Sequence, residues 1–247
     1  MAHKIMLDAG HYGNYYNKGA VSGYYESNMT WELQGYLKEE LESYGFEVGT
    51  TRTDKQKDLA VYERGVKSKG YDLFLSLHSN AASVESADYV ALFHLVKDKT
   101  TNADEQSKLV AGKLAPVIAE LMGTKQKHQV LTKGVDFDRD GDGQLNDNYY
   151  GVLHGADVAN TPGVIIEHSF HTNKAACKWL MDSNNLKKLA AAEAATLAEL
   201  YGMKKQQTSD MIHRVQVGAF RDKSNAEKLL KDLKAAGFDG FITSSKA

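Results

Sequence analysis

The chain has 247 residues, of which 42% are hydrophobic and 25% are charged, a composition typical of globular proteins and not of disordered or coiled-coil ones. Its 30 basic and 32 acidic side chains give a net charge of −2, which argues against nucleic-acid binding. The mean hydropathy of −0.46 and the absence of a long apolar run argue against insertion into a membrane. The single cysteine, Cys177, excludes an internal disulfide framework, and we expect it to be a core residue, not a nucleophile.

Short apolar runs alternate with longer helical patterns up to residue 201. The predicted strands are Lys4–Leu7, Glu47–Thr51, Leu73–Leu77, Tyr89–Leu95 and Val164–Ile166. The predicted helices are Asn28–Tyr44, Leu59–Lys69, Glu105–Leu121 and Asn185–Tyr201. Because the strands are apolar on both faces and alternate with helices, the sequence predicts an α/β fold with a mostly parallel twisted sheet flanked by helices.

A polar stretch separates this pattern from a small C-terminal unit. We expect a main domain, a linker and a β-α-β unit at residues 1–203, 204–211 and 212–247. In the small unit, His213–Phe220 and Gly240–Thr243 predict strands, and Ser224 followed by Glu227 predicts a capped helix between them. A unit of this size has too little core to be stable alone.

Three predicted strands run into polar residues at their carboxyl ends, which are His11, His78 and Glu167 with their neighbours. Since ligands bind at the carboxyl ends of parallel strands, these side chains are expected at one edge of the sheet. A glycine-containing loop after His11 can bring Glu26 to the same edge. Two imidazoles and two carboxylates match a catalytic zinc site, with His₂Glu and water as ligands and the second carboxylate as proton acceptor. Each residue also has a simpler interpretation: histidines at strand ends are more often ordinary hydrogen-bonded residues, and Glu26 suits a helix N-terminus.

Several motifs give the chain a specific resemblance. They are Leu7-Asp8-Ala9-Gly10-His11, Gly19-Ala20, Glu26, Thr51-Arg52, Ser76-Leu77-His78-Ser79-Asn80, Ile165-Ile166-Glu167-His168-Ser169-Phe170 and Thr172-Asn173. In this order and spacing they resemble the zinc-dependent N-acetylmuramoyl-L-alanine amidases of the type 3 family, over about residues 3–201. The resemblance implies that His11, Glu26 and His78 bind Zn²⁺ and that Glu167 is the catalytic residue. It also implies hydrolysis of the amide between N-acetylmuramic acid and L-alanine in peptidoglycan.

Two other activities stay open, a zinc peptidase that cuts inside the stem peptide and a non-catalytic wall-binding protein. The C-terminal segment from His213 to Phe220, with Ala235-Ala236-Gly237-Phe238, resembles the first half of a SPOR domain, a module that binds peptidoglycan. The N-terminus shows no apolar signal segment, so we expect cytoplasmic synthesis and action on the wall after release, as a phage endolysin or a mother-cell lytic enzyme. The sequence does not indicate an oligomeric state.

Further polar residues carry weaker predictions. Asp138, Asp140 and Asp142 match the first half of a calcium-binding loop, although Tyr149 stands where its glutamate would be, and an ordinary acidic loop fits as well. We expect His168 and His171 to be structural residues behind the site. Asp8 and Asn80 are candidates to orient the metal-binding histidines.

Overall fold

The computed structural model describes residues 2–97, 102–139, 141, 143, 145, 147–206 and 215–244. The chain divides into two compact units, Met1–Gln206 and Gln207–Ala247, and each is described by itself. Among the described residues, no helix is both long and apolar enough to span a bilayer.

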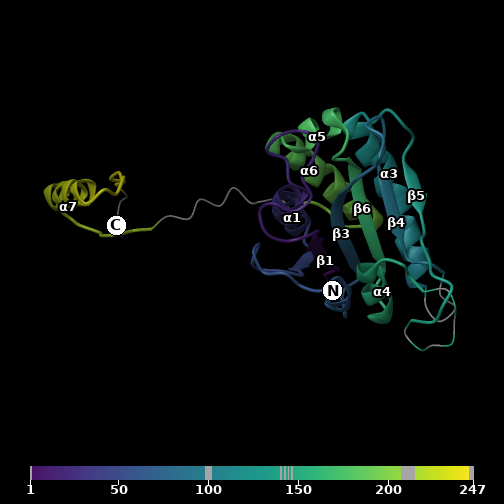
Figure 1. Cartoon of the computed structure of the whole chain (residues 1–247). Helices are drawn as coiled ribbons and strands as arrows, with labels where there is room; N and C mark the ends of the chain where they lie inside the picture. Colours follow the sequence, from purple (N-terminus) through teal and green to yellow (C-terminus); the bar gives the residue numbers. More distant parts are fainter. Residues whose placement is uncertain are drawn as a thin grey trace. The chain divides into compact units, whose positions relative to one another are not determined.

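The first unit is built on a six-stranded sheet with the strand order β2-β1-β3-β6-β4-β5 (Figure 1). Its strands are β1 Lys4–Ala9, β2 Glu47–Thr50, β3 Leu73–Asn80, β4 Ala91–His94, β5 Gln129–Leu131 and β6 Gly163–Phe170. All neighbouring pairs are parallel except β4 with β6, which is antiparallel. The predicted mostly parallel sheet is therefore confirmed. The sequence prediction missed β5, which has three residues and no buried side chain.

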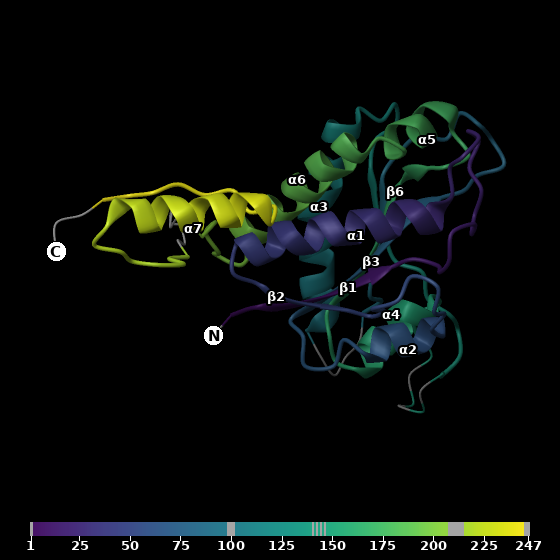
Figure 2. The same cartoon turned by 90° about the vertical axis from the view of Figure 1, so that its left-hand side faces the viewer.

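Helices cover both faces of this sheet (Figure 2). They are α1 Glu26–Ser43, α2 Val61–Val66, α3 Ala103–Met122, α4 Gly151–Val158, α5 Lys174–Leu180 and α6 Ser183–Leu200. α1, α3 and α6 pack their apolar stripes on one face, where Leu7, Leu75 and Ile166 are fully buried. α4 covers the other face, over Phe74 and Ile165, and packs against α2. Burial on both faces explains why these strands are continuous apolar runs.

Three parallel strands, β1, β3 and β6, occupy adjacent central positions in the sheet. His78 is the register partner of Glu167, and Ala9, two residues before His11, is the partner of Leu77. The carboxyl ends of these strands therefore bring His11, His78 and Glu167 to one edge, as the sequence predicts.

The second unit contains α7, Lys223–Ala235. The expected capping box at Ser224 and Glu227 is wrong, because Asp222 precedes the helix and its carboxylate accepts the Ser224 backbone N–H at 2.9 Å. Neither residues 215–220 nor Gly240–Thr243 form a strand, since no described neighbour pairs with them, and the start of the first predicted strand, His213, lies outside the described residues. No described side chain of this unit is fully buried, which agrees with the small core expected from its length.

Candidate metal centre

His11 follows β1 in an unusual backbone conformation that two contacts hold in place. Its φ is 61°, in the left-handed region that non-glycine residues seldom adopt. The Arg64 guanidinium donates to the carbonyl oxygens of His11 and Ala9, both at 3.1 Å. The preceding residue must be small, because a Cβ on Gly10 would lie 2.3 Å from Cε1 of His78. The motif Gly10-His11 thus lets two imidazoles approach each other.

Glu26 is the first residue of α1 and is almost fully buried. Its Oε1 accepts the backbone N–H of Ser79 at 2.9 Å, and its Oε2 accepts Nδ2 of Asn17 at 2.8 Å. Its position at the helix N-terminus also favours a negative charge. The carboxylate is therefore fixed from two sides before any ion is considered.

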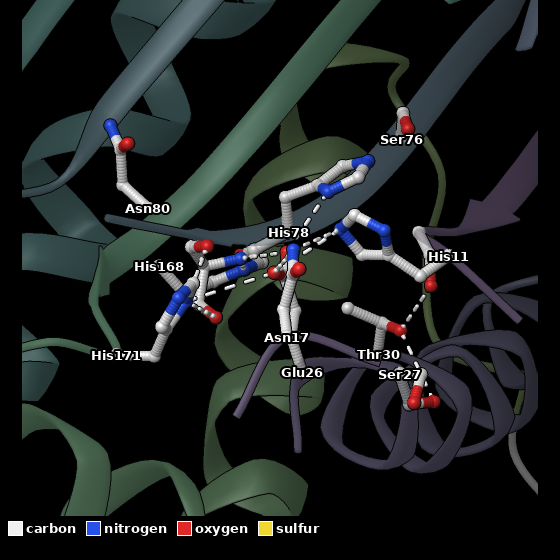
Figure 3. A network of polar contacts seen from close by, with 12 residues as sticks. His11, Asn17, Glu26, Ser27, Thr30, Ser76, His78, Asn80, His168 and His171 are labelled. Carbon is white, nitrogen blue, oxygen red and sulfur yellow. Dashed lines mark hydrogen bonds and ion pairs between the residues drawn. The ribbon is translucent and has the colours of Figure 1, made fainter. Parts of the chain in front are cut away.

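The imidazoles of His11 and His78 both approach the carboxylate of Glu26 (Figure 3). Nε2 of His11 lies 3.2 Å from Oε2 of Glu26, and Nδ1 of His78 lies 3.0 Å from Oε1. One potential ligand atom from each of the three residues lies within 4.8 Å of the other two, so the group could hold a metal ion. Two imidazole nitrogens and a carboxylate oxygen are a donor set that suits zinc.

The charges of this group are strongly coupled. Burial alone would raise the pKa of Glu26, but hydrogen bonds from His11 and His78 hold it well below its usual range. Burial alone would lower the pKa of His78, but the Glu26 carboxylate raises it to about 9. Without a metal, a proton on His78 therefore compensates the buried charge of Glu26 at neutral pH.

Glu167 lies beside His78 on the neighbouring strand β6. Its Oε2 is buried and has no hydrogen-bond partner among the described residues. Burial and the nearby charge of Glu26 raise the pKa of Glu167 to about 7, against the opposing effect of His78. A carboxyl group with a pKa near neutrality and a free oxygen can both accept and return a proton at physiological pH.

The two other histidines of this region contact the backbone of β3. Nδ1 of His168 donates to the carbonyl oxygen of His78 at 2.9 Å, and its Nε2 lies 2.8 Å from Oε1 of Glu193. Nδ1 of His171 donates to the carbonyl oxygen of Ser79 at 2.9 Å, and lies 3.7 Å from Oε2 of Glu26. His168 therefore has both nitrogens engaged by protein groups, which fits a structural residue and not a ligand.

Asp8 and Asn80 are expected from the sequence to orient the metal-binding histidines, and the contacts described for their side chains are with other groups. The buried Asp8 carboxylate accepts the hydroxyls of Thr51 and Ser76, at 2.6 and 2.7 Å, and lies 3.5 Å from Nη1 of Arg64. Oδ1 of Asn80 accepts the backbone N–H of Ala81 at 2.8 Å. Asp8 thus acts at one remove, by holding the arginine that binds the His11 carbonyl.

Three residues of the site were not found by reading the sequence. Asn17 lies in an irregular loop, yet its Nδ2 is 3.0 Å from Nε2 of His11 as well as in contact with Glu26. Arg64 comes from the short helix α2. Glu193 could have been found from the sequence, because it lies between Ala190 and Leu197 on the apolar, buried face of α6, where a carboxylate needs a polar partner.

Two weaker sequence predictions fall outside this centre. Cys177 is a buried free cysteine, as expected of a core residue. Asp138 accepts the backbone N–H groups of Gly141 and Gly143, at 2.6 and 3.0 Å, while Asp140 and Asp142 lie outside the described residues. Calcium binding there stays a prediction.

Comparison with known proteins places this geometry in a family. The family model "N-acetylmuramoyl-L-alanine amidase" matches residues 5–199, and the SPOR domain model matches residues 183–244. The first part of the SPOR match coincides with α6, whose Leu186, Leu189 and Leu197 belong to the core of the first unit. That part of the match is therefore integrated into the amidase fold.

Individual relatives agree with the family match. The chain is 26% identical to the N-acetylmuramoyl-L-alanine amidase CwlM of Bacillus licheniformis and to the sporulation-specific N-acetylmuramoyl-L-alanine amidase of Bacillus subtilis, over 97% of this chain and 84% of each relative. Among solved structures, Cwp6 from Clostridium difficile has a TM-score of 0.64 at 26% identity, over 81% of this chain and 29% of that longer one. The catalytic domain of CwlV from Bacillus (Paenibacillus) polymyxa shares the fold, with a TM-score of 0.64 at 16% identity, over 82% of this chain and 99% of that one. The chain belongs to the N-acetylmuramoyl-L-alanine amidase family of peptidoglycan hydrolases, as the motifs around His11, Glu26, His78 and Glu167 indicate.

Proposed function

We propose that this chain hydrolyses the amide between N-acetylmuramic acid and L-alanine with one Zn²⁺ held by His11, Glu26 and His78. The observation that carries the proposal is the convergence of these three side chains, from separate segments, with ligand atoms within 4.8 Å of one another. When bound, zinc would supply a Lewis acid that polarises the scissile carbonyl and lowers the pKa of water to about 7.

Glu167 performs the proton transfers in this proposal. Its carboxylate takes a proton from the water that attacks the carbonyl carbon, and then gives this proton to the departing nitrogen of L-alanine. Its unpaired Oε2 and its pKa of about 7 support both steps, since the same group must accept and release a proton within one turnover.

The products distinguish this activity from its alternatives. Digestion of purified peptidoglycan is expected to release free stem peptides that begin with L-alanine, detected by mass spectrometry, and to leave glycan strands bearing unsubstituted lactyl groups. Fragments that end within the stem peptide would identify a zinc peptidase instead. No release at any zinc concentration would leave only a wall-binding role.

The setting in which the enzyme acts is a separate proposal. We propose synthesis in the cytoplasm and action on the wall after lysis of a mother cell, and one relative's description as sporulation-specific supports this over phage release. Immunoblots of a sporulating culture should then show the protein before mother-cell lysis. Detection only after prophage induction would contradict the assignment.

We also propose that the C-terminal unit binds peptidoglycan, on the strength of the SPOR match that extends to residue 244. Removing residues 207–247 is expected to reduce co-sedimentation with sacculi while activity on soluble muropeptides is retained, because the first unit is compact without them. The loss should be largest on sacculi already stripped of stem peptides. Equal sedimentation of the full and shortened chains would contradict wall binding by this unit.

A further inference from the structure

The edge of the sheet at the metal centre contains an irregularity that regular strands would not have. β3 and β6 pair in register up to His78 and Glu167, and the next paired residues are Asn80 and Phe170. One residue of β3, Ser79, therefore faces two residues of β6, His168 and Ser169. This is a β-bulge on β6, and Ser169 lies in the left-handed region with a φ of 57°.

The bulge turns two imidazoles back toward β3. His168 donates from Nδ1 to the carbonyl oxygen of His78, and His171 donates from Nδ1 to the carbonyl oxygen of Ser79, each at 2.9 Å. Two successive carbonyl groups of β3 are therefore each held by a buried side chain. A backbone carbonyl only accepts hydrogen bonds, so Nδ1 is the donor in each of these two contacts. In His171 the same Nδ1 also lies 3.0 Å from the Ser79 hydroxyl.

The held segment supplies two of the contacts to Glu26. The N–H of Ser79 donates to Oε1 of Glu26 at 2.9 Å, and Nδ1 of His78 lies 3.0 Å from the same atom. A rotation of this segment would therefore displace both contacts at once. Both histidines also contact other side chains. Nε2 of His168 contacts the fully buried Glu193 of α6. Nδ1 of His171 lies 3.0 Å from the Ser79 hydroxyl, which lies 2.7 Å from the hydroxyl of Tyr24.

We propose that His168 and His171 are positioning residues, which clamp the carbonyl groups of His78 and Ser79 and so aim the His78 imidazole and the Ser79 N–H at Glu26. The clamp acts through the backbone of β3 and, for His171, also through Oε2 of Glu26, which lies 3.7 Å from its Nδ1; neither histidine is one of the proposed metal ligands. It rests on the proposed metal centre for its functional consequence, but its own contacts belong to the protein alone.

Replacement of His171 tests this clamp with a matched pair of variants. His171→Leu removes the donor, while His171→Asn keeps an N–H close to the position of Nδ1. If His171 clamps the Ser79 carbonyl, His171→Leu should weaken zinc binding about 10- to 100-fold, as expected when a partner that orients a ligand is lost. His171→Asn restores affinity to within a few-fold of the parent, as measured by competition with a chromophoric chelator.

The same substitutions at His94 control for the loss of a buried imidazole. His94 lies on β4, is also buried, and donates from Nδ1 to a backbone carbonyl, that of Leu95, at 2.8 Å. It is paired with Val164, at the opposite end of β6 from the bulge. His94→Leu should lower the melting temperature of the metal-free protein and leave zinc affinity unchanged.

Three results would overturn the clamp. One is parental zinc affinity in folded His171→Leu. Another is failure of His171→Asn to restore affinity, which would mean that Nε2 of His171 is needed, as for a ligand. If His171→Leu does not fold, His168→Asn provides the second test, because it keeps a donor toward the His78 carbonyl and should retain zinc affinity; loss of affinity in that folded variant would refute the proposal. If the parent chain binds no zinc, the metal centre itself is wrong, an outcome distinguishable from loss confined to the variants.

Discussion

Replacing Glu167 by Gln should lower kcat by about 10²- to 10⁴-fold, the range that general acid–base catalysis contributes, and should leave the bound zinc in place. Glutamine keeps the shape of the side chain but neither accepts nor returns a proton at neutral pH. Turnover of a soluble muropeptide and the zinc content after dialysis measure the two effects separately. Glu47→Gln, an exposed position on β2 paired with Lys4, should leave both unchanged.

The Glu167→Gln substitution should also stabilise the metal-free protein at alkaline pH. The pKa of Glu167 is raised to about 7 from 4.5, so its carboxylate favours the unfolded state, increasingly as the pH rises between these values. The full difference corresponds to at most about 3 kcal/mol, and the neutral amide of the Glu167→Gln variant would not carry this penalty. Thermal unfolding of both proteins without zinc should show a higher melting temperature for Glu167→Gln at pH 8 and no such gain below pH 4. A variant with full activity and unchanged stability would refute the role given to Glu167.

Replacing His78 by Ala should abolish stable zinc binding, because one of the three proposed ligands is lost and Glu26 loses the nearest positive charge. Zinc measured after dialysis should fall to near zero, while His94→Ala should keep the parental metal content. Stoichiometric zinc in a folded His78→Ala protein would contradict the proposed ligand set.

The parent protein should also release a proton when it binds zinc at pH 7. The pKa of metal-free His78 is raised to about 9, so this imidazole is protonated at neutral pH and must lose that proton to become a ligand. The contribution of His78 to the number of protons released should fall toward zero as the pH rises through 9, while a zinc-bound water with a pKa of about 7 adds its own proton at high pH. Calorimetric titrations in buffers of different ionisation enthalpy give this number directly, and a value near zero at pH 7 would show that His78 is not a ligand.

The sequence was sufficient to predict the edge of the sheet at which the polar residues meet. His78 and Glu167 directly follow apolar residues, and His11 comes four residues after Leu7, the last residue of the predicted first strand. Parallel strands align their carboxyl ends. Both the apolar runs, such as Lys4–Leu7, and the polar residues that follow them can be read from the local sequence, so this prediction needs no knowledge of how the strands pack. The strand order was not predictable, because it depends on which strands pair across loops of any length.

The supporting contacts could not be predicted for a different reason. Spacing does not tell which of Glu26 and Glu167 is a ligand and which a base, and only the resemblance to a family separated them. The contact of Asn17 with Glu26 depends on an irregular loop, and the His168–Glu193 pair joins residues 25 positions apart on β6 and α6. The helix start at Asp222 was misread because Ser224 and Asp222 are both good capping residues, and the structure selects the earlier one.

The proposed ligands come from the loop after β1, the start of α1 and the end of β3, so one ion would cross-link three separate stretches of the first unit. Any species that binds only the native state shifts the folding equilibrium in its favour, in proportion to the logarithm of its concentration over its dissociation constant. A low concentration of the metal would therefore reduce the stability of the folded chain as well as the activity of the enzyme, and would make the chain easier to unfold and to degrade. Without the ion the protein would be both inactive and less stable, and binding of the ion would restore activity and stability together.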